Sequence, residues 1–571
     1  MTMRRGHREV TGEPDGGTRS PAGDAPTLRA HRGLVTLCVL GAVLETALVS
    51  LFGPTAALAL APQVTAPAPF AVFHDLRWLL VYTPSWAAVA AGILAFLGVR
   101  TAVTALTVRL AWPRGVDPMP WRALLIRSLP YTLAAAVLLA GSASLLVAFA
   151  LASVSYLWFA ALPIALAVAM LIHHGPVAVW WRHHPTLRTA GWAALTFLVL
   201  TLGGATLTVA PTPLRLPAAA AVGLFNAWAW LGIVRGIACR QVRVQFVPVA
   251  PAGLAALALS VLIALTVGSA PEALAGIGTP EQHAPSRGRP VLLASGYGVG
   301  WRGAQDPGTL GPGLSVRRYS YAGVTDAGQP LPYRPEATRQ PLPRLVDQMQ
   351  RQVRELAAES GRPVDIVAES EGALIAEAYL LTTRDAPVRR VVLLSPLVQP
   401  GRASYPPDGQ AGYGLAAGWQ LRRMSAAMRA LTPVDMPADS PFLRSLADHA
   451  RALGAAAGCP HPGVEQLAVL PLADAVGTPY GAAFGIPTRV APALHGRLYE
   501  DASALQSVGG YLRTGQFSIQ PPWVVAQRLV RAAAAAWQAP DLSAVTDRTR
   551  AEESQTGRCR AAREELRGWL G

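Results

Sequence analysis

One serine stands in a setting that suits nucleophilic catalysis. Ser370 follows the apolar run of residues 364–368 and has the small residues Ala368 and Gly372 two positions to either side. Larger side chains there would collide on a sharp turn from strand to helix, the turn that exposes a serine hydroxyl. The following helix would direct its amino-terminal amides at the same point, where they can stabilise an oxyanion. Ser370 is therefore a candidate nucleophile, and an ordinary turn serine is the alternative.

A serine hydroxyl becomes a good nucleophile when a base removes its proton, and imidazole is the commonest base. His495 directly follows Leu494, at the end of an apolar run, and precedes a glycine. The other histidines in this half of the chain lie in a Pro/Gly-rich linker or between expected strands: His283, His449 and His461. Position and elimination both favour His495 as the base.

A carboxylate is then needed to orient the imidazole and to stabilise its charged form. Asp474 lies two residues after Leu472, where another apolar run ends. The preceding apolar run ends at residues 394–396 without a carboxylate. Asp474 is the preferred candidate, but Asp435 or Asp439 could also reach this position from the intervening segment.

These three side chains need elements that bring them together. Short apolar runs at 289–294, 314–321, 364–368, 391–394, 467–472 and 488–494 indicate strands, and 345–358 has helical spacing. Strands that alternate with helices predict a mostly parallel sheet with helices on both faces. Ligands of such sheets bind beyond the carboxyl ends of the strands, which is where all three candidates fall.

The chain order Ser370, Asp474, His495, together with these strand positions, resembles the α/β-hydrolase superfamily over roughly residues 285–540. The resemblance implies that Ser370 is the nucleophile, His495 the base and Asp474 the orienting acid. It also implies an oxyanion hole made by the backbone amides of Tyr297 and Glu371.

The sequence departs from the family pattern at two places. The turn expected to supply one oxyanion amide, the oxyanion turn (residues 295–298), has Ser295 and Gly296 where many members have His-Gly. In the turn that carries the serine, the nucleophile elbow, Ala368 replaces the first glycine of the motif Gly-x-Ser-x-Gly. Glutamates also stand on both sides of the serine, at Glu369 and Glu371. Negative charges there would oppose an oxyanion, so we expect these side chains to turn outward or to pair with arginine.

Residues 397–465 are too long for a simple connection between two core strands. They contain helical patterns at 415–431 and 441–453 and predict a cap insertion over the strand ends. Four large apolar residues could line an acyl pocket under this cap: Trp419, Met424, Met428 and Phe442. Alternatively, they pack the cap against the sheet.

The first half of the chain has the composition of a membrane domain. Only 15% of all residues are charged, and the apolar residues concentrate before position 271. About 20 helical residues cross the hydrocarbon core, so we expect about seven transmembrane helices, at 33–53, 84–108, 130–151, 155–172, 191–210, 216–237 and 251–270. The proline-rich stretch 54–83 is uncertain, and a re-entrant segment there would change the count.

The arginines predict the orientation of these helices. They gather in the amino-terminal tail and in alternate connections, while the other connections hold only Arg77 and Arg215. The positive-inside rule then places the amino terminus in the cytoplasm, and seven spans place the hydrolase-like domain outside the membrane. Because the net charge of +15 arises mainly in this first half, a nucleic-acid partner has little support.

The remaining organisation is simpler. We expect a disordered cytoplasmic tail at 1–32, a transmembrane domain at 33–270, a linker at 271–288, the hydrolase-like domain at 289–540 and a polar helix or tail at 541–571. Metal-ligand spacings and cofactor-binding motifs are missing from the sequence, so neither a metal nor a cofactor is expected. The oligomeric state stays open.

Three polar features of the sequence remain outside the catalytic prediction. Glu45 lies inside the first expected span, where helix packing is favoured over transport because a pathway would show more ionisable residues. Asn226 is a candidate hydrogen-bond partner for it. Cys459 and Cys559 would both be extracytoplasmic, and whether they form a disulfide is left open.

The sequence therefore predicts a membrane-anchored extracytoplasmic serine hydrolase that acts on carboxylic esters of lipids or of the cell envelope. Two alternatives remain. The same triad would serve an acyltransferase, because the triad does not decide whether water accepts the acyl group. A membrane scaffold or receptor with an inactive hydrolase fold is the other.

Overall fold

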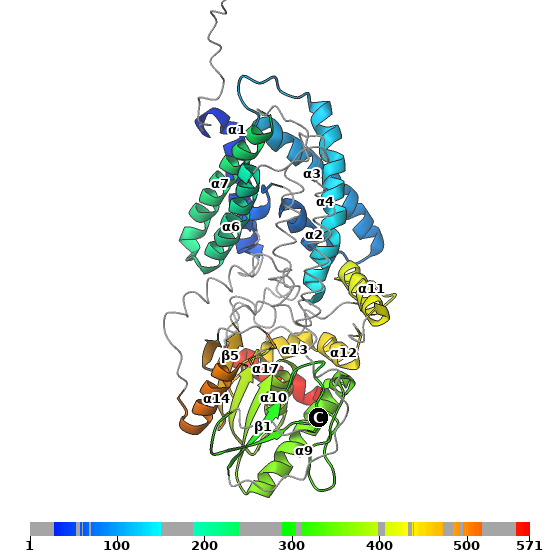
Figure 1. The fold of residues 1–571 in the computed structure, drawn as a ribbon, viewed down its shortest axis with the longest axis vertical. Coiled ribbons are helices and arrows are strands. Elements are labelled where there is room, and N and C mark those ends of the chain that lie inside the picture. Colours follow the sequence, from blue (N-terminus) through cyan, green and yellow to red (C-terminus); the bar gives the residue numbers. More distant parts are fainter. Residues whose placement is uncertain are drawn as a thin grey trace, which may run out of the picture.

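The structure of the protein is a computed structural model. It describes residues 28–52, 58–59, 61–67, 70–149, 187–238, 288–303, 310–397, 406–431, 437, 439–471, 484–491, 495–496, 498–499, 501–516 and 555–570. The described residues between 28 and 238 form a helical domain, and those from 288 onward form an α/β domain at one end of it (Figure 1). The start of the first long helix lies at the far end of the helical domain (Figure 1).

The helical domain consists of long helices around a short one. Its elements are η1 (Leu28–His31), α1 (Arg32–Phe52), η3 (Ala61–Gln63), α2 (Phe70–Tyr82), α3 (Trp86–Leu110), α4 (Trp121–Phe149), α6 (Leu187–Val209) and α7 (Thr212–Ala238). Helix α1 packs along α7, α6 packs on α7, and α3 packs on α4. Large apolar side chains remain exposed on these helices, among them Leu44, Leu48 and Leu94, as suits helices surrounded by lipid.

Within the described residues, three helices are long and apolar enough to cross a membrane: Arg32–Leu51, Trp86–Leu110 and Thr212–Arg235. The described structure therefore contains three such helices where the sequence predicts seven. Helix α6 has 23 residues, of which Leu195–Val209 form a shorter apolar stretch within the described residues, so its crossing of a membrane stays a prediction. The predicted spans 155–172 and 251–270 lie outside the described residues.

The uncertain stretch 54–83 contains a buried helix. Helix α2 has 13 residues and packs against α3, α4 and η3. Phe70, Ala71 and Val72 at its start are almost completely buried. Its length of about 20 Å, at 1.5 Å per residue, is too short for a full crossing. Apolar composition alone could not show that this segment lies inside the helical domain.

The α/β domain is built on a six-stranded, entirely parallel sheet, in agreement with the predicted parallel arrangement. The strands are β1 (Arg289–Ala294), β2 (Leu314–Arg318), β3 (Val364–Glu369), β4 (Val388–Leu394), β5 (Glu465–Pro471) and β6 (Thr488–Ala491). Their order in the sheet is β2-β1-β3-β4-β5-β6. The chain order reverses direction between β1 and β3, and the carboxyl ends of these two central strands lie side by side there.

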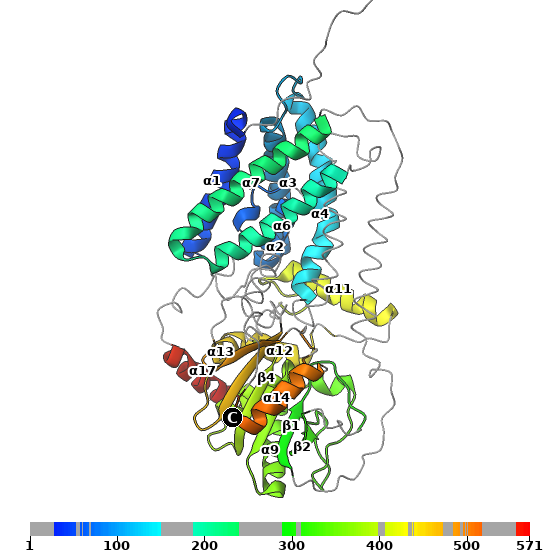
Figure 2. The ribbon, with the colours of Figure 1, turned by 60° about the vertical axis from the view of Figure 1, so that its left-hand side comes forward.

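Helices cover both faces of this sheet. The other elements of the α/β domain are η5 (Pro335–Arg339), α9 (Leu342–Ser360), α10 (Glu371–Thr382), α11 (Leu415–Leu431), α12 (Pro441–Asp448), α13 (Ala450–Ala456), α14 (Ala502–Thr514) and α17 (Gln555–Leu570). Alternate residues along each strand face opposite sides. Leu292 and Ile366 pack on the face covered by α9, α10 and α17, while Val291 and Val367 pack on the face covered by α14 (Figure 2).

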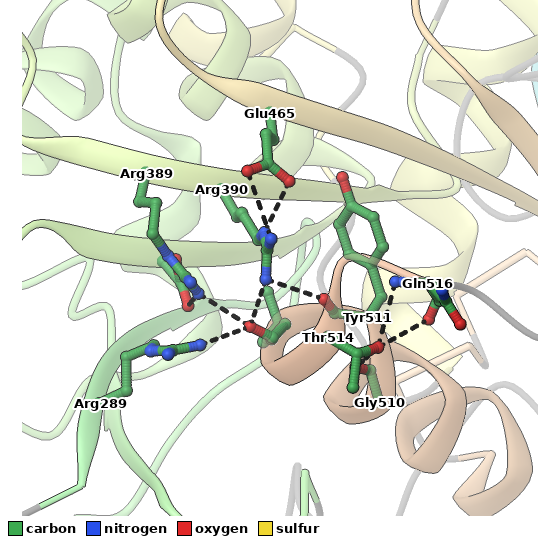
Figure 3. Close-up of polar contacts among 10 residues, drawn as sticks. Arg289, Arg389, Arg390, Glu465, Gly510, Tyr511, Thr514 and Gln516 are labelled. Atoms are coloured by element: carbon green, nitrogen blue, oxygen red, sulfur yellow. Dashed lines mark hydrogen bonds and ion pairs between the residues drawn. The ribbon is translucent and has the colours of Figure 1, made fainter.

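Arginines hold the end of α14 at the amino edge of the sheet (Figure 3). Arg289, Arg389 and Arg390 each donate to the Leu512 carbonyl at 2.8 Å. Cations are favourable at this position because the carboxyl end of a helix carries a partial negative charge. Arg389 also pairs with the fully buried Asp365, with its Nε 2.9 Å from Oδ1. This clamp fixes the helix that follows the predicted catalytic histidine.

A disulfide joins Cys459 to Cys559, with a Cα–Cα distance of 5.8 Å and 100 residues of sequence separation. This answers the question that the sequence left open. Helix α17 packs against α10 and α13, and its Ala562 and Leu566 belong to the core on that face of the sheet. The described part of the carboxyl-terminal segment is therefore docked on the α/β domain.

The helices of the segment predicted as a cap pack on two different parts of the protein. Helix α11 packs against α4, α2 and α3 of the helical domain (Figure 2). The Gly412 amide donates to the Pro84 carbonyl at 2.8 Å, just before α3 begins. Helix α12, in contrast, packs on α9 and η5. The insertion thus connects the α/β domain to the helical domain.

Candidate active site

The turn between β3 and α10 has the geometry that the sequence predicts. Ser370 has φ 53° and ψ −111° and is the residue that precedes α10. Only Ser370 and Ser395 have positive φ among the described non-glycine residues. The Ser370 amide donates to the Leu394 carbonyl at 2.9 Å, which anchors the turn to β4. Backbone strain of this kind persists where the surrounding structure imposes it, and it is frequent at functional sites.

The structure brings His495 to this serine across 125 residues of sequence. The Ser370 Oγ lies 3.0 Å from His495 Nε2, within hydrogen-bond distance. The imidazole is 8% exposed, so the contact is largely shielded from water. The competing histidines of the described structure lie elsewhere, because His449 stacks on Trp569 and His461 contacts the Thr383 carbonyl. His283 lies outside the described residues.

Close packing explains the small residues around the serine. A Cβ on Gly372 would lie 2.8 Å from the Ser295 carbonyl oxygen and 2.9 Å from the Ala294 Cβ. A Cβ on Gly296 would lie 3.2 Å from the Ser370 Cβ. The elbow and the turn after β1 therefore approach each other so closely that side chains at these glycines would push them apart.

The two predicted oxyanion donors lie on these same segments. Glu371 is the first residue of α10, and Tyr297 lies in the turn after β1. Helix α10 has 12 residues, and the dipole at its amino terminus favours negative charge beside Ser370. The Tyr297 hydroxyl donates to Ser440 Oγ at 3.0 Å, which joins the oxyanion turn to the start of α12.

The expectation that Glu369 and Glu371 turn outward is wrong. Glu369 is 3% exposed and Glu371 is fully buried. Glu369 Oε1 accepts a hydrogen bond of 3.0 Å from the Leu498 amide. This bond ties the segment that carries His495 to the strand that carries Ser370. The carboxylate that the sequence suggested as a surface group is therefore a structural link within the site.

For Glu371, burial reduces the expected repulsion between its carboxylate and an oxyanion. Burial raises the pKa of Glu371 well above its usual range, although the nearby Tyr321 hydroxyl acts in the opposite direction. Burial thus favours the neutral form of this carboxyl and opposes a negative charge beside an oxyanion on Ser370.

Sequence reasoning missed a set of tyrosines behind the oxyanion turn. The Tyr321 hydroxyl donates to the Ser295 carbonyl at 2.6 Å, and the Ser295 hydroxyl lies 3.0 Å from the Tyr333 hydroxyl. All three side chains are almost completely buried. The alternating pattern of residues 314–321 predicted Tyr321 at a strand end. Its role, however, depends on its contact with Ser295 in the turn after the neighbouring strand β1.

The acid of the predicted triad is not decided by the described residues. Asp474 and Asp435 both lie outside them. Asp439 is described, and its Oδ1 lies 3.5 Å from Arg422 Nη1 on α11. That contact directs the Asp439 carboxylate toward α11. Asp474 stays a prediction.

The two candidate pocket residues whose side chains are described, Phe442 and Trp419, have different surroundings. Phe442 is buried, and its ring stacks on Tyr297 with centroids 5.7 Å apart, so it lies beside the oxyanion turn. Trp419 is 41% exposed and meets Trp86 of the helical domain edge-on at 5.9 Å. Helix α11 packs on the helical domain, and the assignment of Trp419 to an acyl pocket stays a prediction. Met424 and Met428 also lie on α11, and their side chains are outside the described part.

Comparison of the chain with protein-family models, with curated proteins and with solved structures finds no match. In the part of the chain that the structure describes, histidine, cysteine and carboxylate side chains form no group of three that could hold a metal ion.

Proposed function

We propose that the protein is a membrane-anchored serine hydrolase that acts on carboxylic esters through Ser370 and His495. The observation that carries this proposal is the 3.0 Å contact between Ser370 Oγ and His495 Nε2 at a strained turn between strand and helix. Residues brought together from distant positions at the carboxyl ends of parallel strands are typical of a catalytic site. The strand order and the serine after β3 support the resemblance to the α/β-hydrolase superfamily.

The contact supports a two-step acyl transfer. His495 Nε2 removes the hydroxyl proton while Ser370 Oγ attacks the ester carbonyl, and the resulting oxyanion accepts bonds from the Glu371 and Tyr297 amides. The imidazolium then gives its proton to the leaving alcohol oxygen, which leaves an acyl-enzyme. Water, deprotonated by the same imidazole, attacks the acyl group, and the imidazolium returns this proton to the leaving Ser370 oxygen as the acid is released. In this proposal Asp474 orients His495 through its second ring nitrogen.

The location favours an ester of the bilayer or of the cell envelope. The insertion that contributes Phe442 beside the oxyanion turn also contributes α11, which packs on α2, α3 and α4. A substrate with a long acyl chain could therefore pass from the bilayer to the serine along one segment of protein. We also propose that seven spans with a cytoplasmic amino terminus place the α/β domain outside the membrane.

Two observations support this orientation. The beginning of α1 and the α/β domain lie at opposite ends of the helical domain (Figure 1). The Cys459–Cys559 disulfide is of the kind that persists in oxidising, extracytoplasmic compartments.

A fluorophosphonate probe on purified full-length protein tests the proposed activity. We expect labelling of the wild type and its loss in Ser370→Ala and in His495→Ala, with ester hydrolysis reduced by roughly 10⁴–10⁶-fold. Ser360→Ala and His461→Ala are matched controls, because Ser360 lies at the end of α9 and His461 contacts backbone carbonyls. Both controls should label normally. Full labelling of Ser370→Ala would refute the nucleophile assignment.

A further inference from the structure

The helical domain contains a chain of four ionisable side chains from three helices. Glu45 comes from α1, His74 and Asp75 from α2, and Arg100 from α3. His74 Nε2 lies 2.7 Å from Glu45 Oε1, and His74 Nδ1 lies 3.0 Å from Asp75 Oδ1. Arg100 binds Asp75 with two of its N–H groups, one of them at 2.6 Å. The imidazole therefore stands between two carboxylates.

The surroundings of this chain are built to hold it. Arg100 also donates to the Val64 carbonyl at 2.6 Å, and Arg77 donates to Gln63 Oε1 at 2.8 Å. From α7, Asn226 donates to the Pro62 carbonyl at 3.1 Å and the Trp230 indole donates to the Thr65 carbonyl at 3.0 Å. Non-helical backbone at this depth needs such internal partners. These bonds fix the segment that carries α2 into the domain.

The contacts of His74 with two carboxylates favour an additional proton on its ring. A neutral imidazole has one N–H donor and one acceptor nitrogen, while ionised carboxylates only accept. With both ring nitrogens against carboxylate oxygens, a neutral His74 would direct a lone pair at one of them. Both contacts are favourable when the imidazole carries two protons. This state binds one proton more than a neutral histidine between two carboxylates.

The charges around the imidazole are consistent with a proton as the ligand. They are Glu45 from α1, Asp75 and Arg77 from α2, and Arg100 from α3, while the residues of α7 that bind the 62–65 segment are neutral. The two arginines balance the two carboxylates, so one added proton leaves a single positive charge. A divalent metal would meet two fixed cations, and Glu45 and Asp75 lie at different ring nitrogens of His74, so the three side chains form no group that could hold a metal among the described residues.

We propose that Glu45, His74 and Asp75 form a proton-binding site inside the helical domain, which gives this domain a function beyond anchoring. His74 holds the proton between the two carboxylates, and Asp75 provides the exchange route. The His74 side chain is 5% exposed, whereas that of Asp75 is 26% exposed. Simple packing does not require this cluster, because a buried ionic network contributes little more stability than apolar side chains of the same volume. Ionisable groups inside a membrane domain are a sign of function.

Nitrogen-15 NMR of histidine-labelled full-length protein in lipid nanodiscs tests the site. We expect one imidazole to carry both ring protons at pH 7–8, where exposed histidines are neutral, and this signal to be absent in His74→Gln. In Glu45→Gln the same ring should lose its proton at a pH lower by roughly one to three units, because a neighbouring carboxylate is lost. Thr46→Val is the control on the same helix, since the Thr46 hydroxyl bonds only its own helix in the described structure.

Two results would overturn the proposal. One is a neutral His74 ring throughout this pH range, and the other is a Glu45→Gln protein whose ring titrates at the same pH as that of the wild type. Fluorophosphonate labelling of Ser370 in each variant reports whether the protein is folded. The labelling and the histidine signal are independent, so the proton site can fail while the hydrolase proposal stands.

Discussion

The position of Ser370 depends on the glycines that surround it as much as on its own hydroxyl. The positive φ of the serine is imposed by a turn that packs against Ser295 and Ala294 through Gly372. The carbonyl of Ser295 is itself held by the Tyr321 hydroxyl. The elbow and the oxyanion turn are thus one packed unit, and a methyl group at the contact should disturb both.

We predict that Gly372→Ala slows fluorophosphonate labelling by about 10²–10³-fold, the cost of losing one oxyanion donor. The added Cβ would lie 2.8 Å from a backbone oxygen, so the backbone must move. Gly510→Ala is the matched control, because a Cβ there has open space on α14. That control should label like the wild type and gain up to about 1 kcal/mol of stability. Normal labelling of Gly372→Ala would show that the turn tolerates displacement.

The buried glutamates show a second effect at the scale of single residues. Glu369 accepts a hydrogen bond from the Leu498 amide, and Glu371 lies where burial raises the pKa of its carboxyl. Neither outcome follows from the local sequence, where a glutamate beside a turn is most simply read as a surface residue. Burial by the elements that pack above the turn decides both cases.

At the scale of elements, α10 is linked to the segment after α13 by another buried carboxyl. The Gly458 amide donates to Glu377 Oε1 at 2.8 Å, next to the disulfide at Cys459. Burial raises the pKa of Glu377 from 4.5 to about 7, partly opposed by the Gly458 amide. The unfolded chain releases this proton near pH 4.5, while the folded protein keeps it until about pH 7. The stability contributed by this group is therefore fully present below pH 4.5 and lost as pH rises to about 7.

We predict that Glu377→Gln removes this pH dependence. A carboxyl whose pKa rises from 4.5 to about 7 costs on the order of 3 kcal/mol of folding free energy once ionised. The variant should therefore be more stable than the wild type by about that amount at pH 8, and similar to it at pH 4.5. Thermal and denaturant unfolding at both pH values measures the difference.

Glu465→Gln is the control for this comparison. The Glu465 carboxylate lies at the surface, and its pKa is lowered by the hydrogen bond from Arg390. Removal of an exposed pair of this kind changes stability by about 1 kcal/mol or less. Parallel pH profiles for wild type and Glu377→Gln would contradict the buried-carboxyl explanation.

At the scale of the whole molecule, the two domains are joined by more than the chain between them. The Gly412 amide bonds to Pro84, and Trp419 packs on Trp86, so α11 rests on the helices of the other domain. Helix α2 contacts both α11 and the helices around the proposed proton site. The fold thus places the insertion of the α/β domain in contact with the helix that carries His74.

The disulfide provides a test of orientation at this scale. We predict that a protein with Cys38→Ser and Cys239→Ser, treated in intact cells with a membrane-impermeant reductant, takes up two maleimide-polyethylene glycol groups. The remaining Cys459 and Cys559 are bonded and face the outside in the proposed topology. Gel mobility measures the uptake. Modification that requires cell lysis would place the α/β domain in the cytoplasm.

The sequence by itself determined the features that local patterns encode. Apolar runs of strand length predicted the parallel sheet, and small residues around Ser370 predicted the elbow, because both depend on neighbours along the chain. Chain order and strand ends together predicted the meeting of Ser370 with His495, since the carboxyl ends of parallel strands share one edge.

The tertiary structure decided everything that depends on which surfaces meet. In the folded protein Glu369 and Glu371 are buried and Cys459 is bonded to Cys559. Trp419 contacts the helical domain, and α2 lies inside that domain. The tertiary structure also surrounds Glu45 with partners that are distant in sequence. Apolar and charged residues look alike in sequence whether they face lipid, solvent or another helix. Burial and pairing are properties of the packed elements, and only the packing reveals them.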